Sequence, residues 1–254
     1  MDKVLLAGPW VGEFGYELCQ WQGFIRKMSR DYDKTIVASR PGHEVLYSDF
    51  CSEYIPYEIN IEDCNKWKSD VKYDGSIFDG VDFSKHVKPQ KMEGKQEYFK
   101  YGTFSEYCRY DLVIHARDFK NVKGRRNWPV EKWSEFIRKF RDKYGDLKVC
   151  SIGISSSSAC VETTDDNRDL PLSEVVDILH SSKLTIGPSS GPMHLASLCG
   201  CPHLVWAEYN LVYERYAKSW NPFNTKAILH PKEGCNPSVN SILNLIDMNN
   251  LIEV

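Results

Sequence analysis

The segment Gly187-Pro-Ser-Ser-Gly-Pro-Met-His-Leu-Ala-Ser-Leu-Cys-Gly200 follows a short apolar run and decides how the rest of the chain is interpreted. It predicts a strand that ends near residue 186, a turn of small residues, and a helix from about Gly191 to Gly200. The first N–H groups of a helix and its positive dipole end together favour bound phosphate. His194 falls in the first turn of this helix and could donate to the same anion. The spacing is equally compatible with an ordinary strand-to-helix turn that contains a buried histidine.

Composition indicates a globular protein of moderate size. The 254 residues suffice for one large domain or two small ones, and the formal net charge is −3. Such a charge does not suit nucleic acid as a general partner, because phosphate backbones are bound by basic surfaces. No apolar run approaches the ~18 residues of a membrane span, and the first residues break too early for a secretory signal. We therefore expect a cytoplasmic protein, and the sequence does not predict its oligomeric state.

The 9 cysteines include no CxxC pair, which favours reduced thiols over a disulfide framework or a zinc site. The acidic pair Asp165-Asp166 lies in a segment that we expect to be a loop. We therefore expect neither a metal nor a cofactor.

Strand and helix patterns alternate along most of the chain. Strands are expected at Lys3–Ala7, Lys34–Ser39, Tyr54–Glu58, Leu112–His115, Leu147–Ile152 and His203–Trp206, besides the one before Gly187. Helices are expected up to about Met28, from 43 to about Ser52, from Pro129 to Tyr144, from Leu172 to Leu179, and from Pro237 onward. This alternation predicts an α/β fold with parallel sheets. Residues 59–107 show no periodicity, which suggests two units with a junction near residue 108.

Ligands of such folds bind beyond the carboxyl ends of the strands. Four turns are expected there, at residues 8–15, 116–127, 153–158 and 187–191. The second is cationic, and its candidates for contact with a diphosphate are Arg117, Lys123 and Arg126. The alternative is that these are solvated loop charges.

Three motifs match a known pattern: Ile114-His-Ala-Arg117, Arg126-Asn-Trp-Pro-Val-Glu-Lys-Trp133 and the segment that begins at Gly187. Together they resemble the heptosyltransferase-like group of GT-B glycosyltransferases (glycosyltransferase family 9), over roughly residues 111–206. The resemblance implies two Rossmann-like units that face each other across a cleft. Residues 1–108 would form the acceptor-side domain, residues 109–236 the donor-binding domain, and the C-terminal helix (237–254) would pack back on the first.

The resemblance also implies roles for individual residues. Glu13 would take the general-base position in a glycine-flanked acceptor-side loop that includes Gly12, Gly15 and Tyr16. The donor phosphates would be bound by Arg126, Ser189, Ser190, Gly191 and His194. Ser189 stands where the family usually has aspartate, so the sugar and nucleotide are left open. The segment from His115 to Arg117 also resembles fucosyltransferases that use GDP-fucose, which keeps GDP-linked donors among the options.

The implied reaction moves a sugar from a nucleotide-diphosphate sugar to an acceptor hydroxyl. Arginines and a helix dipole can stabilise the departing diphosphate without a metal, and a carboxylate can deprotonate the acceptor. Direct attack then inverts the anomeric carbon. Glu17 and His115 are the next candidates for the base, because Glu13 could instead be an acid that merely favours a helix start. A nucleotide-sugar epimerase and a non-catalytic nucleotide-sugar binder are the alternative functions.

Overall fold

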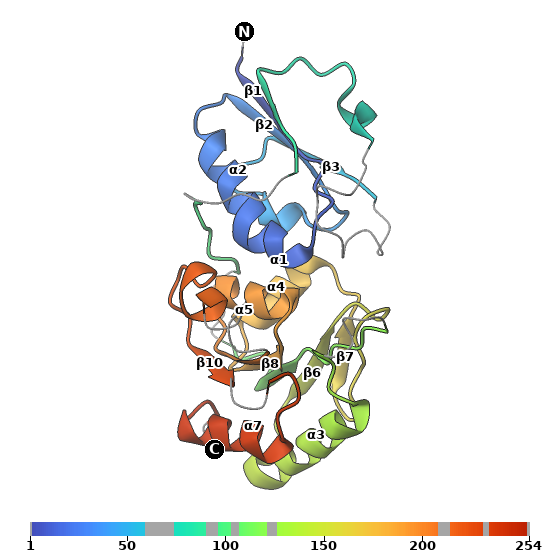
Figure 1. Cartoon of the computed structure of the whole chain (residues 1–254), viewed down its shortest axis with the longest axis vertical. Helices are drawn as coiled ribbons and strands as arrows, with labels where there is room; N and C mark the ends of the chain where they lie inside the picture. Colours follow the sequence, from blue (N-terminus) through green and yellow to red (C-terminus); the bar gives the residue numbers. More distant parts are fainter. Residues whose placement is uncertain are drawn as a thin grey trace. The chain divides into compact units, whose positions relative to one another are not determined.

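The computed structural model describes residues 2–58, 74–89, 96–102, 107–120, 126–207, 214–230 and 234–252. The chain divides into two compact units, Met1–Phe99 and Lys100–Val254, so the boundary precedes the expected junction near residue 108. Each unit is built on a parallel sheet with helices (Figure 1), which confirms the predicted α/β class. The expectation of a cleft concerns the placement of the units and stays a prediction.

The first unit has a four-stranded sheet in the order β3-β2-β1-β4. Its strands are β1 (Val4–Ala7), β2 (Lys34–Ser39), β3 (Glu53–Pro56) and β4 (Lys85–Val87). All neighbouring pairs are parallel. The two central strands are buried almost throughout, as a sheet covered on both faces requires. β4 lies within residues 59–107, where the sequence shows no periodicity.

One continuous helical run follows β1 in the first unit. It consists of α1 (Phe14–Tyr16), a π-helical turn (Glu17–Trp21) and α2 (Gln22–Ser29). The helix expected from 43 to about Ser52 is instead a short 3-10 turn, Glu44–Leu46, so that prediction is wrong. Serine, aspartate, phenylalanine and cysteine fill residues 48–52, and none of them strongly favours a helix. A second 3-10 turn spans Gly75–Phe78.

The second unit has a six-stranded parallel sheet in the order β10-β9-β8-β5-β6-β7. Its strands are β5 (Leu112–Ile114), β6 (Val149–Gly153), β7 (Asp165–Arg168), β8 (Thr185–Pro188), β9 (His203–Trp206) and β10 (Ala227–His230). The direction of chain progression reverses between β5 and β8, as in Rossmann-like sheets. The segment that contains Asp165-Asp166 was expected to be a loop, but it is edge strand β7, where charged side chains deter further pairing.

Helices cover both faces of this second sheet. They are α3 (Val130–Tyr144), α4 (Leu172–His180), α5 (Gly191–Cys199) and α7 (Val239–Met248), with a π-helical turn at Arg215–Ser219. Figure 1 shows α3 and α7 on one face and α4 and α5 on the other. The α5 segment starts and ends where its sequence predicts.

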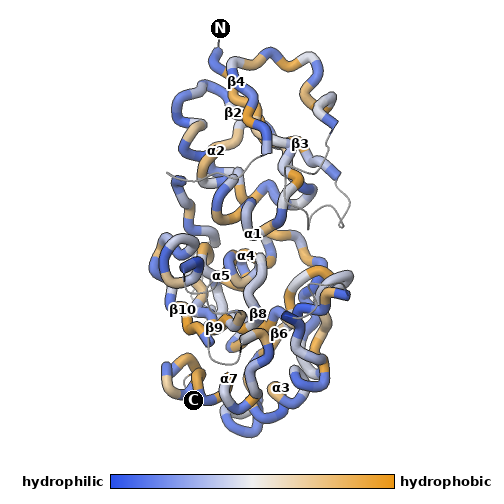
Figure 2. The backbone as a smooth tube through the Cα atoms, in the orientation of Figure 1, coloured by the Kyte–Doolittle hydropathy of each residue, from blue (hydrophilic) through white to orange (hydrophobic). Residues whose placement is uncertain are grey.

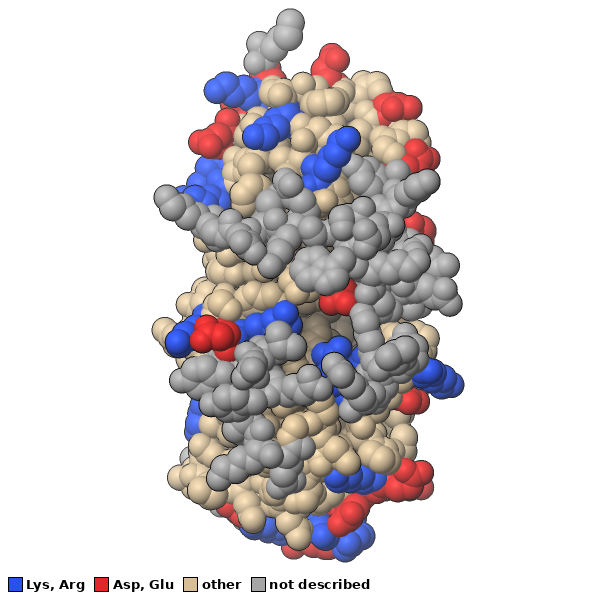
Figure 3. All heavy atoms as spheres, in the orientation of Figure 1, with Lys and Arg blue, Asp and Glu red and all other residues tan. Residues whose placement is uncertain are grey.

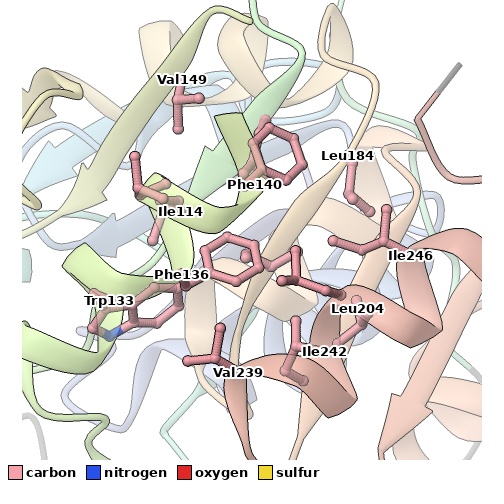
Figure 4. Packing of buried hydrophobic residues seen from close by; sticks show 14 of the residues in the cluster. Ile114, Trp133, Phe136, Phe140, Val149, Leu184, Leu204, Val239, Ile242 and Ile246 are labelled. Atoms are coloured by element: carbon pink, nitrogen blue, oxygen red, sulfur yellow. The ribbon is translucent and has the colours of Figure 1, made fainter. Parts of the chain in front are cut away.

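The main core of the second unit lies under α3 and α7. Trp133, Phe136 and Phe140 of α3 meet Ile242 and Ile246 of α7 over the strands, as Figure 4 shows. The apolar side of α7 is therefore used within the second unit. The expectation that residues 237–254 pack back on the first unit is wrong, because the same apolar residues match α3 and its sheet.

Polar and apolar residues are interspersed along the backbone of both units (Figure 2). Among the described residues, no helix combines the length and hydropathy needed to cross a bilayer. Figure 3 shows lysine, arginine, aspartate and glutamate side chains intermixed on the visible face.

Candidate functional site

The predicted donor residues gather where β5 and β8 end. These strands are neighbours in the sheet, and their following segments leave from the same carboxyl edge, at the point where strand order reverses. Ligands of open α/β sheets bind at such a switch point. The Ser190 hydroxyl lies 2.9 Å from His115 Nδ1, which joins the two segments directly. We call His115, Arg117, Ser189, Ser190 and Gly191 the switch-point site.

Two glycines allow the backbone to approach His115 closely. A Cβ on Gly187 would lie 3.0 Å from the His115 carbonyl oxygen and 3.1 Å from Met193 Sδ. Gly153 has φ +132°, and a Cβ there would lie 2.5 Å from Ser158 Oγ and 3.1 Å from His115 Cδ2. Glycine at these two positions therefore leaves the space that His115, Ser158 and Met193 occupy.

The start of α5 retains the features that favour an anion. Ser190 is the extended N-cap residue, but its side chain makes no capping hydrogen bond. Its hydroxyl contacts His115 instead. The N–H groups of Gly191 and Met193 and the helix dipole are thus not neutralised by the N-cap side chain, while Pro192 between them has no N–H.

Two of the predicted arginines reach this site. Arg126 donates from Nη1 to the Ser189 carbonyl oxygen at 2.7 Å. Arg117 is buried, donates to Asn127 Oδ1 at 2.8 Å, and lies over the Phe119 ring at 4.8 Å. Burial, followed by the charges of Arg117 and Arg126, lowers the pKa of His115 to about 3. His115 is therefore neutral near pH 7, and the arginines supply the positive charge.

His194 is part of the same helix start but carries no charge. It is buried, and its ring stacks on Tyr216 at 4.2 Å and meets the edge of Trp220 at 4.6 Å. Burial, with lesser effects from Arg215, His203 and Arg126, holds its pKa well below the usual range. Within the described chain, its Nδ1 has no hydrogen-bond partner. His194 is therefore neutral near pH 7 and cannot form an ion pair with an anionic ligand.

The π-helical turn beside α5, Arg215–Ser219, is not predicted by the sequence. Tyr216 OH lies 3.4 Å from both Ser190 N and Ser189 Oγ. Arg215 lies over the Trp220 ring at 4.3 Å. A cluster of arginine and aromatic residues was the only sequence signal here, and only the tertiary packing brings it to the switch-point site.

The predicted acceptor-side loop lies in the first unit, after β1. Glu13 is the half-buried N-cap residue of α1, and its carbonyl oxygen accepts from the N–H groups of Tyr16 and Glu17, both at 3.1 Å. A Cβ on Gly12 would lie 2.5 Å from Trp10 Cζ2, so glycine is required there. Arg40, just after β2, donates to the Gly12 carbonyl oxygen.

Glu17 is fully buried beneath this loop. Its Oε1 accepts from Tyr47 OH at 2.8 Å and from the Ser39 hydroxyl, while Oε2 lies 2.9 Å from His43 Nδ1. Burial opposes ionisation, but His43, Arg40 and Ser39 outweigh it and lower the pKa of Glu17 to about 2. Such a carboxylate is a poor proton acceptor. Glu17 therefore does not suit the role of general base, for which it was the next candidate after Glu13.

His115 is also a poor base, because its pKa is about 3.

Lys123 lies outside the described residues. Among those described, no group of three or more His, Cys, Asp or Glu side chains could hold a metal ion. That observation does not test the expected metal-independence.

No family model and no curated protein matches this sequence. Solved structures do match. ADP-heptose LPS heptosyltransferase II of E. coli has a TM-score of 0.55 and 13% identity, with 98% of both chains covered. A glycosyl transferase family 9 protein of Veillonella parvula has a TM-score of 0.58 and 11% identity, with 97% of this chain and 96% of that chain covered.

The iron-containing dodecameric glycosyltransferase TibC of enterotoxigenic E. coli has a TM-score of 0.54 and 14% identity. The match covers 91% of this chain but only 63% of TibC, so this chain spans less than two thirds of that protein. These similarities show the fold, and the predicted GT-B-like α/β architecture is confirmed at that level.

Proposed function

We propose that this chain, which has the fold of the heptosyltransferases, transfers a sugar from a nucleotide-diphosphate sugar to an acceptor hydroxyl. The observation that carries the proposal is the convergence of Arg117 and Arg126 with the uncapped start of α5. This combination of guanidinium groups and helix N–H groups suits a diphosphate. It also opposes the charge that develops when the diphosphate departs.

The donor phosphates would lie between the start of α5 and Arg126. Ser189 places a neutral hydroxyl where the resembled family has a carboxylate, so no acidic side chain at this position opposes the phosphates. The structural neighbours include a heptosyltransferase bound to ADP and one bound to an ADP-heptose analogue, which makes ADP-linked sugars the first donors to test. GDP-linked and UDP-linked sugars complete the panel.

The acceptor would be deprotonated on the first unit. Glu13 follows the carboxyl end of β1 and is half-buried, whereas Glu17 is an enclosed anion with a low pKa. We propose Glu13 as the general base. Its direct action on the acceptor, with no covalent intermediate, would make the enzyme inverting and independent of a metal.

The test is a thermal-shift panel of ADP-, GDP- and UDP-linked sugars, followed by assay of the stabilising compound for transfer. A ligand at ~100 times its dissociation constant adds ~2.7 kcal/mol to stability. Arg126→Ala should lose most of the shift. Arg138→Ala is the matched control, since this arginine is 65% exposed on α3 and paired with Asp142.

Failure of every nucleotide sugar to stabilise the protein would contradict the proposal. Conversion of the donor to an epimer without an acceptor would identify the alternative enzyme class. Tight binding with neither transfer nor hydrolysis would identify a non-catalytic binder.

A further inference from the structure

Arg215 begins the π-helical turn beside α5 and has no role in the reaction so far described. We propose that Arg215 supplies a second guanidinium to the donor site and binds the diphosphate from the side opposite to Arg126. This inference rests on the proposed function, because it concerns the same anion at the start of α5.

The strand order places Arg126 and Arg215 on the two sides of the strand that leads into α5. This strand, β8, lies between β5 and β9 and is parallel to both. Arg126 belongs to the segment that follows β5, and Arg215 belongs to the segment that follows β9. Because the three strands are parallel, these segments leave from the same carboxyl edge of the sheet, where ligands of such folds bind. Both neighbours of β8 thus contribute an arginine to this edge.

Aromatic contacts connect Arg215 to the first turn of α5. Its guanidinium carbon lies 4.3 Å from the centre of the Trp220 ring, and the Trp220 ring meets that of His194 at 4.6 Å. The next residue, Tyr216, stacks on His194 at 4.2 Å, and its hydroxyl lies 3.4 Å from Ser190 N. Arg215 is therefore held beside the residues that begin α5.

A buried amide fixes the turn that carries Arg215. Asn221 donates from Nδ2 to the carbonyl oxygens of Tyr216 and Thr225, at 2.9 and 2.7 Å. Thr225 in turn donates from Oγ1 to the carbonyl oxygen of Ser197 in α5, at 2.7 Å. Because these bonds already order the turn, an anion that binds Arg215 has little backbone to immobilise.

Two arginines act electrostatically on the first turn of α5. Burial lowers the pKa of His194 most, Arg215 has the largest effect among the neighbouring charges, and Arg126 has a smaller one. Arg215 is half-buried, so water screens its charge less than that of an exposed arginine. A guanidinium that lies over an aromatic ring uses its face, and its N–H donors stay in its plane, where phosphate oxygens can accept from them.

The experiment measures the affinity for pyrophosphate by calorimetry, because this probe has neither a base nor a sugar. Arg215→Met removes the charge but keeps an unbranched side chain that can pack on Trp220. It should weaken pyrophosphate binding by about tenfold, which corresponds to about 1.4 kcal/mol. Its affinity should also depend less on salt concentration than that of the wild type.

Two further variants separate charge from packing. Arg215→Lys keeps the charge and should retain most of the affinity. Lys218→Met is the matched control, because Lys218 is a cation of the same turn that is 64% exposed and lies 3.6 Å from Glu214. This control should bind pyrophosphate as the wild type does. The thermal-shift panel of nucleotide sugars is repeated on all three variants.

Unchanged affinity in Arg215→Met, together with a loss in Arg126→Ala, would overturn the inference and leave the proposed donor site intact. Equal losses in Arg215→Lys and Arg215→Met would also overturn it, because Arg215 would then act through packing on Trp220. If pyrophosphate binding depends on Arg215 but no nucleotide sugar binds, the role of the arginine is confirmed and the proposed function fails. If the wild type binds neither pyrophosphate nor a nucleotide sugar, both fail.

Discussion

The switch-point site of the second unit and the acceptor-side loop of the first unit have the same structural origin but opposite chemistry. Each follows the carboxyl end of a central parallel strand, β5 or β1. In the second unit, arginines surround neutral histidines and a helix start. In the first unit, the buried carboxylate of Glu17 contacts His43, whose ring lies near that of Phe14, the residue after Glu13. The same framework thus places positive charge at the end of one strand and a buried negative charge after the other.

The largest expected difference between the two regions is their response to acid. In the second unit, burial lowers the pKa of His115 to about 3 and that of His203 to about 4, and it holds the pKa of His194 well below its usual range. In the unfolded chain these histidines bind protons below about pH 6.5, the ordinary histidine pKa, whereas in the folded protein they stay neutral. The free energy of unfolding is therefore largest above that pH and decreases as the pH falls below it. Each histidine can contribute up to about 2.7 kcal/mol over two pH units.

In the first unit the pKa of Glu17 falls from 4.5 to about 2, so its contribution to stability is lost only below about pH 4.5. Between pH 6.5 and 4.5, amide hydrogen exchange should therefore accelerate in β5, β8 and β9 before it does in β1 and β2, after correction for intrinsic rates. Simultaneous loss of protection in both units would contradict this comparison.

The proposed base, Glu13, should show the next largest effect. Glu13→Gln should keep its donor affinity and lose ~10²–10⁴-fold in transfer rate, because the amide cannot accept the acceptor's proton. Single-turnover kinetics with saturating donor would measure this loss. Asp31→Asn, an exposed carboxylate of the same unit, is the control. A normal transfer rate in Glu13→Gln would mean that Glu13 is not the base and only favours the start of the helix.

Glu17 should matter for stability more than for chemistry. Because its folded pKa lies about 2.5 units below its ordinary value, its ionisation contributes about 3 kcal/mol at pH 7. Glu17→Gln should lose roughly this free energy of unfolding at pH 7. The difference from wild type should shrink toward pH 3, as denaturant titrations at both pH values would measure. A constant difference at both pH values would mean that shape, rather than charge, is what the site requires.

Arg126 should show the smallest of the predicted effects. Its replacement by alanine removes one charged hydrogen-bond donor and should weaken donor binding by ~1.5–3 kcal/mol. Calorimetry with the identified nucleotide sugar would measure the change, and raised salt should reduce it. If both Arg126→Ala and Arg117→Ala bind the donor with unchanged affinity, the switch-point site does not bind the donor.

The sequence predicted the elements whose signals lie in neighbouring residues, such as the spacing of apolar residues or the residues that begin and end a helix. The α3 stripe and the Gly187–Gly200 turn are examples, because burial and helix ends follow from neighbouring residues. It failed for β7, since a polar edge strand looks like a loop until its partner β6 is known. It also failed for the partner of α7, because an apolar stripe does not specify which surface it covers.

The site was predicted less completely than the fold. Serine, glycine and arginine at strand ends were visible in the sequence, and the structure brings most of them together. Arg215 and Tyr216 were not found, because a π-helical turn has no simple periodicity. The burial of Glu17 depends on Ser39, His43 and Tyr47, which are distant in the chain and show their relation only in the folded state.

Gly153 and Gly187 also constrain how this protein can evolve. Any side chain at either position would press on His115 or its immediate neighbours, so the inner wall of the switch-point site is closed to stepwise substitution. New ligand preferences would therefore arise at side chains near the start of α5, such as Ser189, Arg215 and Trp220, of which Ser189 and Trp220 are themselves buried. A directed-evolution library confined to those three positions would sample the variation that is open to natural selection.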